Sequence, residues 1–153
     1  MRLTFHTDYA LRVLIFLAVC PDGRVTTTEI ADSFGLSHHH LRKVVESLRD
    51  QDLVSTARGR TGGLRLSRPP SEINIGALVR GTETDLDLVE CMGRGRCRIS
   101  PACRLKGIFA EALTSFMGIL DRYSLADVVS NQDELISLLD LGENADVNGR
   151  KTA

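Results

Sequence analysis

Three cysteines, Cys91, Cys97 and Cys103, lie at even spacing in the middle of the chain, with five residues between neighbours. The segment 91–106 around them is rich in glycine and arginine and has five basic residues but no acidic one. Cysteine thiolates are ligands of zinc and of iron–sulfur clusters. Structural zinc sites favour cysteine pairs only about two to four residues apart. Wider, even spacing in a basic segment favours a bulkier, anionic iron–sulfur centre, and an isolated zinc site is the alternative.

Three cysteines leave one coordination position of such a centre open. The N-terminal segment offers two candidates for the fourth ligand, His6 and Asp8. Asp8 also precedes Arg12 by four residues, so an ion pair within one helix is the simpler prediction for its side chain. Cys20, beside Pro21, ends an expected helix and is better explained as a buried structural thiol.

Two helices are expected in the first part of the chain. Residues 8–19 have apolar side chains on one helical face and precede a Pro-Asp-Gly turn at 21–23. A second helix, capped by Thr27 or Thr28, is expected to end at Gly35.

A helix-turn-helix followed by a hairpin is predicted next. Ser37 is expected to cap a third helix with an apolar stripe, which completes a helix-turn-helix at about 27–51. Two short strands of alternating polarity, joined by the loop RGRTGG, form a hairpin wing at about 53–68. Together they predict a winged helix-turn-helix DNA-binding domain over residues 1–80.

The predicted third helix begins with polar and basic side chains, and the predicted wing is rich in arginine. Side chains at the start of a recognition helix reach phosphates and base edges in the major groove, and wing arginines suit the minor groove. A protein-interaction module with a solvated polar face is the alternative; the combination favours duplex DNA. The side chains expected to contact DNA are Thr28, Ser37, His38, His39, His40, Arg42, Lys43, Arg58, Arg60 and Arg65.

An apolar stripe from Leu105 to Tyr123 predicts a long helix, which we expect to start at the Ser100–Pro101 pair. A long apolar seam of this kind usually pairs with a second copy of the chain. Ser124 and Asp127 have the spacing of a capping box for a last short helix.

These elements predict a mainly α fold with a small β-hairpin wing. Residues 81–104 are expected to form a cysteine cluster-binding loop. Residues 101–140 supply a dimerisation helix and a C-terminal helix, and 141–153 form a disordered tail.

The charge of the chain is unevenly distributed. The 153 residues, about one domain in length, carry a net charge of −1, which excludes a uniformly basic, histone-like nucleic-acid binder. Residues 1–68 carry +3 and 91–106 carry +5, whereas 69–90 carry −4 and 107–153 carry −5. Each of the two basic segments indicates an anionic partner.

No segment has the length and composition of a signal peptide or a membrane span, because the most apolar stretch, 11–20, is short and contains Arg12. We therefore expect a cytoplasmic protein whose cysteines are thiols or metal ligands rather than disulfides. The sequence has no nucleotide-binding loop, no second cluster motif and no acid–base pair. These features argue against an enzyme or an electron carrier.

Several segments resemble the IscR-like family of winged-helix iron–sulfur transcription regulators, and most closely its nitric-oxide-sensing, NsrR-type subgroup. The similar segments are MRLTFHTDYALRVL, RGRTGGLRLSRPPSEINIGALVR, the three cysteines with ISPACRL, and SLADVV. The resemblance extends from residue 1 to about 140. The RGRTGG wing is shared across the family, whereas the cysteine triad and Asp8 point to the subgroup.

The resemblance implies a homodimeric repressor that binds a pseudo-palindromic operator and holds a [4Fe–4S] cluster through Cys91, Cys97 and Cys103. It also implies that Asp8 completes the coordination from the partner subunit. Nitric oxide, the effector, would then lower operator affinity by attacking the cluster. The alternatives are an iron- or redox-responsive regulator with a [2Fe–2S] cluster, for which His6 is a ligand candidate, and a zinc-stabilised DNA-binding protein.

Overall fold

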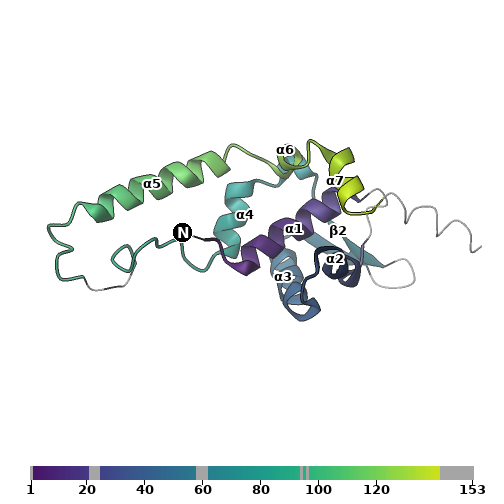
Figure 1. The fold of residues 1–153 in the computed structure, drawn as a ribbon, viewed down its shortest axis with the longest axis horizontal. Helices are drawn as coiled ribbons and strands as arrows, with labels where there is room; N and C mark the ends of the chain where they lie inside the picture. Colours follow the sequence, from purple (N-terminus) through teal and green to yellow (C-terminus); the bar gives the residue numbers. More distant parts are fainter. Residues whose placement is uncertain (1, 21–24, 58–61, 94, 96, 142–153) are drawn as a thin grey trace, which may run out of the picture.

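The computed structural model describes residues 2–20, 25–57, 62–93, 95 and 97–141. It is mainly helical with one antiparallel two-stranded hairpin, which confirms the predicted fold class. Figure 1 shows a head of packed elements around α1 and a long helix, α5, that extends away from this head. The elements are α1 (Phe5–Val19), α2 (Thr27–Phe34), α3 (His38–Asp50), β1 (Val54–Ala57), β2 (Gly63–Leu66), the 3-10 helix η1 (Pro70–Glu72), α4 (Ile75–Thr82), α5 (Leu105–Leu120), α6 (Leu125–Val128) and α7 (Gln132–Leu138).

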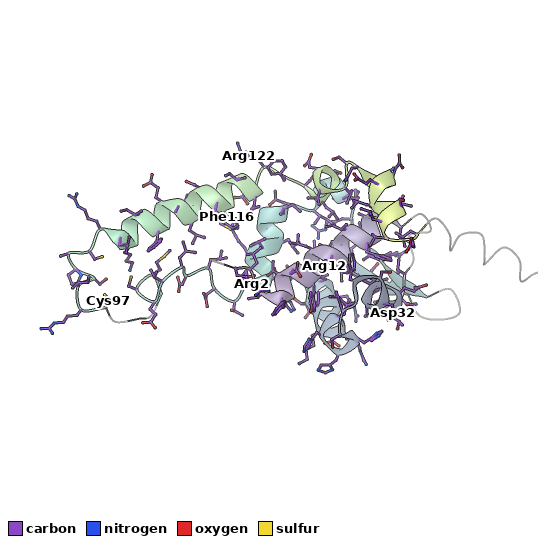
Figure 2. All side chains as sticks on the ribbon, viewed as in Figure 1. Arg2, Arg12, Asp32, Cys97, Phe116 and Arg122 are labelled. Atoms are coloured by element: carbon purple, nitrogen blue, oxygen red, sulfur yellow. The ribbon has the colours of Figure 1, made fainter. Side chains whose placement is uncertain are left out.

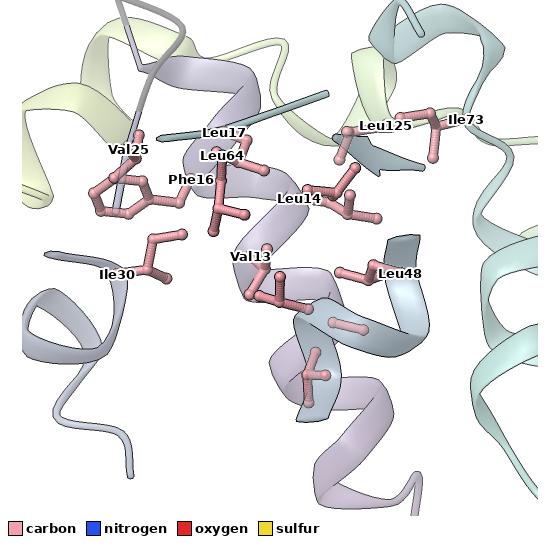
Figure 3. Packing of buried hydrophobic residues seen from close by; sticks show 14 of the residues in the cluster. Val13, Leu14, Phe16, Leu17, Val25, Ile30, Leu48, Leu64, Ile73 and Leu125 are labelled. Atoms are coloured by element: carbon pink, nitrogen blue, oxygen red, sulfur yellow. The ribbon is translucent and has the colours of Figure 1, made fainter. Parts of the chain in front are cut away.

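The core is built around α1, which is apolar on nearly all sides and is typical of a buried helix. Val13 and Leu14 are 0% exposed and Phe16 is 1% exposed. Because α3, β2, α4, α6 and α7 all contact this helix, α1 fixes their relative positions. The side chains that surround it include Val25, Ile30, Leu48, Leu64, Ile73 and Leu125 (Figure 3).

The starts of two helices differ from the sequence prediction. α1 begins at Phe5, three residues earlier than expected, because the Thr4 hydroxyl accepts a hydrogen bond from the Thr7 N–H at 3.3 Å. α5 begins at Leu105, later than the Ser100–Pro101 pair predicted, and the residues between form turns instead.

The cap of α2 also differs from the prediction. Thr26 caps this helix, not Thr27 or Thr28, because only Thr26 has a glutamate three residues further on. The Glu29 carboxylate accepts a hydrogen bond from the Thr26 N–H at 2.6 Å, and the Thr26 hydroxyl accepts one from the Glu29 N–H at 3.2 Å. The predicted end at Gly35 is confirmed, with Gly35 in the left-handed conformation at φ 61°.

The hairpin is anchored to the head at its base. β1 pairs with β2 from Val54 opposite Leu66 to Ala57 opposite Gly63. Val25 adds an isolated bridge to Leu64, with N–H to carbonyl distances of 3.2 and 2.6 Å in the two directions. This third pairing, absent from the sequence prediction, joins the hairpin to the residues that precede α2.

α5 contacts the head mainly through its C-terminal end. Met117 is its one buried residue, at 5% exposure. Along the inner face, Phe109, Leu113 and Phe116 line a cavity of about 390 Å³ beside the segment 83–88. The chain then returns to the head, where α6 and α7 pack against α1.

Within the described residues no helix is long and apolar enough to cross a membrane. Of the tail predicted at 141–153, Leu141 packs against the core, so the expected boundary was one residue too early. The rest of that tail lies outside the described residues.

Candidate nucleic-acid interface and metal-binding segment

The predicted recognition helix, α3, has one buried side and one exposed side. Leu41, Val44 and Leu48 are at most 2% exposed and belong to the core. Apart from Val45 and Ser47, the remaining residues of the helix are exposed, as a recognition helix requires. The structure places five of the predicted DNA-contacting residues in exposed positions on this helix: His38, His39, His40, Arg42 and Lys43.

The two predicted hydroxyl contacts, Thr28 on α2 and Ser37 before α3, are also exposed. Ser37 occupies the N-cap position of α3, but its side chain makes no capping hydrogen bond, contrary to the prediction. The hydroxyl is therefore available for a phosphate oxygen at the positive end of the helix. His38 Nε2 lies 3.3 Å from Asp32 Oδ1 and so connects the start of α3 to α2.

The wing contributes one predicted contact residue to the described part of the structure. Arg65 is exposed on β2, and its Nε donates to the hydroxyl of Ser55, its partner in the strand register, at 3.1 Å. This hydrogen bond holds the Nε end of the Arg65 guanidinium against the surface of the hairpin. The other two wing arginines, Arg58 and Arg60, lie outside the described residues.

Asp8, the candidate fourth ligand, is close to the helix-turn-helix. Its carboxylate is 44% exposed and pairs with Arg12 at 2.9 Å, as the four-residue spacing predicts. The Arg12 guanidinium carbon lies 5.7 Å from the centre of the Phe34 ring, in cation–π range. Phe34 is the last residue of α2 and packs edge-on against Phe16 at 6.0 Å. One ion pair and one ring contact therefore separate the Asp8 carboxylate from the turn before α3.

His6, the other candidate ligand, has a different environment. It lines a cavity of about 350 Å³ between α1 and α3, together with Phe5, Tyr9, His40 and Lys43. The His6 side chain is therefore half-buried beside the recognition helix.

Cys91, Cys97 and Cys103 lie on the segment between α4 and α5, whereas Cys20 directly follows α1. Cys97 is exposed at the far tip, well away from Arg12 (Figure 2), and Cys91 and Cys103 are half-buried. All four cysteines are free thiols. In the part of the chain that the structure describes, no group of three or more His, Cys, Asp or Glu side chains is arranged to hold a metal ion.

The chemistry of the cysteine segment nevertheless fits an iron–sulfur group. Three free thiols lie on one segment of turns, and the neighbouring Arg98 and Arg104 are exposed cations that offset the charge of an anionic cluster. The segment is also tightly wound, because a Cβ added at Gly95 would overlap the Glu90 backbone.

A partly buried contact that the sequence did not reveal connects the start of α1 to Glu83, the residue that follows α4. Glu83 Oε1 accepts hydrogen bonds from the Thr4 N–H at 2.8 Å, the Thr4 hydroxyl at 3.1 Å and the Thr7 hydroxyl at 2.5 Å. Thr7 is fully buried and also lies 2.9 Å from the Thr82 hydroxyl. Burial raises the pKa of Glu83, but the hydrogen bonds from Thr7 and Thr4 outweigh it and lower the pKa overall.

Comparisons with known proteins agree with this architecture. The pattern of the Rrf2 family, described as "Iron-dependent Transcriptional regulator", matches residues 3–131. The HTH-type transcriptional regulator NsrR of Halalkalibacterium halodurans is 44% identical over 144 residues, which cover 92% of this chain and 99% of that relative.

Solved structures show the same similarity. CymR, the global cysteine regulator of B. subtilis, matches with a TM-score of 0.70 and 28% identity over 86% of this chain and 98% of its own. IscR of T. potens matches with a TM-score of 0.70 and 26% identity over 88% of this chain and 90% of its own. The matched proteins are transcriptional regulators, so the expectation that this chain is not an enzyme is confirmed. The chain belongs to the Rrf2 family of iron-dependent transcriptional regulators.

Proposed function

We propose that this chain is a homodimeric, DNA-binding repressor that senses nitric oxide through an iron–sulfur cluster of the [4Fe–4S] type. The observation that carries the proposal is the position of Asp8. Its carboxylate is 44% exposed and is connected to the end of α2 by one ion pair and one ring contact, and it lies on a different element from the segment that carries the three free thiols. The 44% identity to a regulator named NsrR supports the choice of effector.

The dimer is supported by the exposed apolar side chains of α5. Leu105, Ile108 and Ile119 are 51%, 59% and 48% exposed, which is unusual for large aliphatic residues on one helix. Pairing of α5 with a second copy would bury them. In the dimer we assign Cys91, Cys97 and Cys103 of one subunit, with the partner subunit's Asp8, to the cluster.

The coupling to DNA binding follows from the contacts of Asp8. When bound, the cluster supplies iron that reacts with nitric oxide. An Asp8 carboxylate that ligated iron would share less of its charge with Arg12 than it does in the 2.9 Å ion pair described above. The change in Arg12 acts on Phe34, where α2 ends just before the turn into α3. The orientation of α3 would therefore respond to whether Asp8 ligates the cluster or pairs with Arg12.

The DNA contact is assigned to the exposed surface of the helix-turn-helix and wing. Two such surfaces, related by the dimer axis, would read a pseudo-palindromic operator. The residues assigned to DNA are those predicted from the sequence: Thr28, Ser37, His38, His39, His40, Arg42, Lys43, Arg58, Arg60 and Arg65.

An iron- or redox-responsive regulator with the same ligands, or with a [2Fe–2S] cluster, is the second candidate. The family description, which names iron rather than nitric oxide, favours it. The two candidates differ in which treatment releases the DNA under anaerobic conditions, iron depletion or nitric oxide.

The experiment compares the wild type with Asp8→Ala after anaerobic purification, with Glu111→Gln on α5 as the control for loss of an exposed carboxylate. Iron and sulfide content, cluster absorption and operator affinity are measured during a nitric oxide titration. We expect Asp8→Ala to retain the thiol ligands but to lose the dependence of DNA affinity on nitric oxide. Unchanged cluster spectra and an unchanged response of DNA affinity in Asp8→Ala would refute the assignment.

A further inference from the structure

The end of α5 is fixed to both ends of α4 by polar contacts, most of which involve Asp121. The Arg80 guanidinium donates two parallel hydrogen bonds to the Asp121 carboxylate, at 2.6 and 2.7 Å. Asn74 Nδ2 donates to the Asp121 carbonyl at 2.7 Å and to the Tyr123 carbonyl at 3.3 Å. The hydrogen bonds from Arg80 lower the pKa of Asp121, so the pair stays charged at neutral pH.

The backbone at this place is equally constrained. The Ile75 N–H donates to the Tyr123 carbonyl at 3.0 Å, and the Leu125 N–H donates to the Ile73 carbonyl at 2.8 Å. Gly76 is buried, and a Cβ added there would overlap the Asp121 carboxylate and lie 3.0 Å from the Asp121 backbone nitrogen. We call Asn74, Gly76, Arg80 and Asp121 the α4–α5 joint.

Outside the α4–α5 joint, few packing contacts fix the direction of α5 relative to the head. Its inner face borders the cavity of about 390 Å³, and most of its remaining surface is exposed. A helix of 16 residues is about 24 Å long. Rotation of about 8° at one end therefore moves the other end by about 3.4 Å, which is the rise of one base pair.

We propose that the α4–α5 joint sets the angle between the head and α5, the helix through which two copies pair. This angle thereby selects the spacing of the two half-sites in the operator. The inference rests on the proposed function, because it requires a dimer that pairs through α5 and reads two half-sites. Arg80, Asp121 and Gly76 are positioning residues in this scheme and do not contact DNA. An exposed ion pair contributes little to stability, so variants of Arg80 are expected to fold.

The test is selection of bound duplexes from a random DNA library by the full chain, followed by sequencing. Wild type should enrich inverted half-sites at one spacing. Arg80→Ala and Gly76→Ala should enrich the same half-site sequence with the spacing shifted by one base pair or more, or spread over several values. Arg80→Lys keeps the charge but not the two parallel hydrogen bonds, so it should give an intermediate distribution. Arg122→Ala, which removes an exposed cation beside the joint, is the matched control and should retain the wild-type spacing.

Each outcome decides a different point. If the wild type enriches two half-sites and both joint variants, folded by circular dichroism, keep the wild-type spacing with the same sharpness, the joint proposal is wrong. If the wild type enriches single half-sites or no sequence, the proposed dimeric repressor is wrong and the inference falls with it. If Gly76→Ala does not fold, the two Arg80 variants still decide the question.

Discussion

The hydrogen bonds between Thr7 and Glu83 can be tested by the substitution Thr7→Val, which replaces a buried hydroxyl by a methyl group of similar size. A hydrogen bond to a charged group contributes about 1.5–3 kcal/mol. Glu83 retains its two contacts with Thr4 and is partly exposed to solvent, which reduces the loss, and the added methyl group recovers about 0.8 kcal/mol. We therefore expect the free energy of unfolding to fall by about 1 kcal/mol at neutral pH.

The pH dependence separates this contact from simple packing. The pKa of Glu83 is lowered in the folded protein, so its carboxylate contributes stability at neutral pH that is lost as the pH falls through the folded-state pKa. The cost of Thr7→Val should therefore be largest near neutral pH and should shrink as the pH falls through the folded-state pKa of Glu83.

The assay is urea unfolding followed by circular dichroism at fixed protein concentration, because assembly makes apparent stability concentration-dependent. Thr114→Val is the control, since the Thr114 hydroxyl donates only to the Ala110 carbonyl in its own exposed helix turn. This control should change stability by less than about 0.5 kcal/mol. A cost of Thr7→Val that is the same at pH 7 and about pH 3.5 would show that Thr7 acts through packing and not through Glu83.

Two further predictions concern the core and the DNA interface. Phe16→Ala removes a ring that is 1% exposed at the centre of the head, and it should lower the free energy of unfolding by about 3–5 kcal/mol. Urea titration measures this change. A decrease below about 1 kcal/mol would contradict the assigned core. Lys43→Ala should weaken DNA binding for all sequences and reduce the slope of log affinity against log salt concentration by about 1. Glu46→Gln, which changes an exposed residue on the same helix, should not reduce this slope. An unchanged slope in Lys43→Ala would show that Lys43 does not contact the DNA.

Periodicity and capping patterns were sufficient to predict most of the fold. The hairpin, the end of α2 at Gly35 and the capping box at Ser124 and Asp127 all depend on residues close in sequence, and the structure confirms them. The errors at helix starts have local causes. For α2, three consecutive threonines could serve as the cap, and only Thr26 has Glu29 at the position that completes the capping box. For α5, residues 98–102 form turns, so the helix starts after Pro101.

The contacts that connect distant segments could not be predicted in this way. Glu83 meets Thr7 across 76 positions, and Arg80 meets Asp121 across 41. In a single sequence each of these residues is an ordinary polar side chain in or beside a helix, and nothing local indicates its partner. The exposed face of α3 and the ion pair of Asp8 were predictable because helical spacing alone determines them.

The return of the chain to α1 has a consequence for biosynthesis. Leu125 is fully buried and Val129 nearly so against a core otherwise made by residues 10–78, and Leu135 and Ile136 pack on the same core. When the wing of a nascent chain has emerged from the ribosome, the core of the head is therefore still incomplete, because residues 125–136 have not yet been translated. The DNA-binding surface becomes fully stable only after the cysteine segment and α5 have been synthesised. A newly made chain thus completes its core only when the cysteine segment and α5 are already attached.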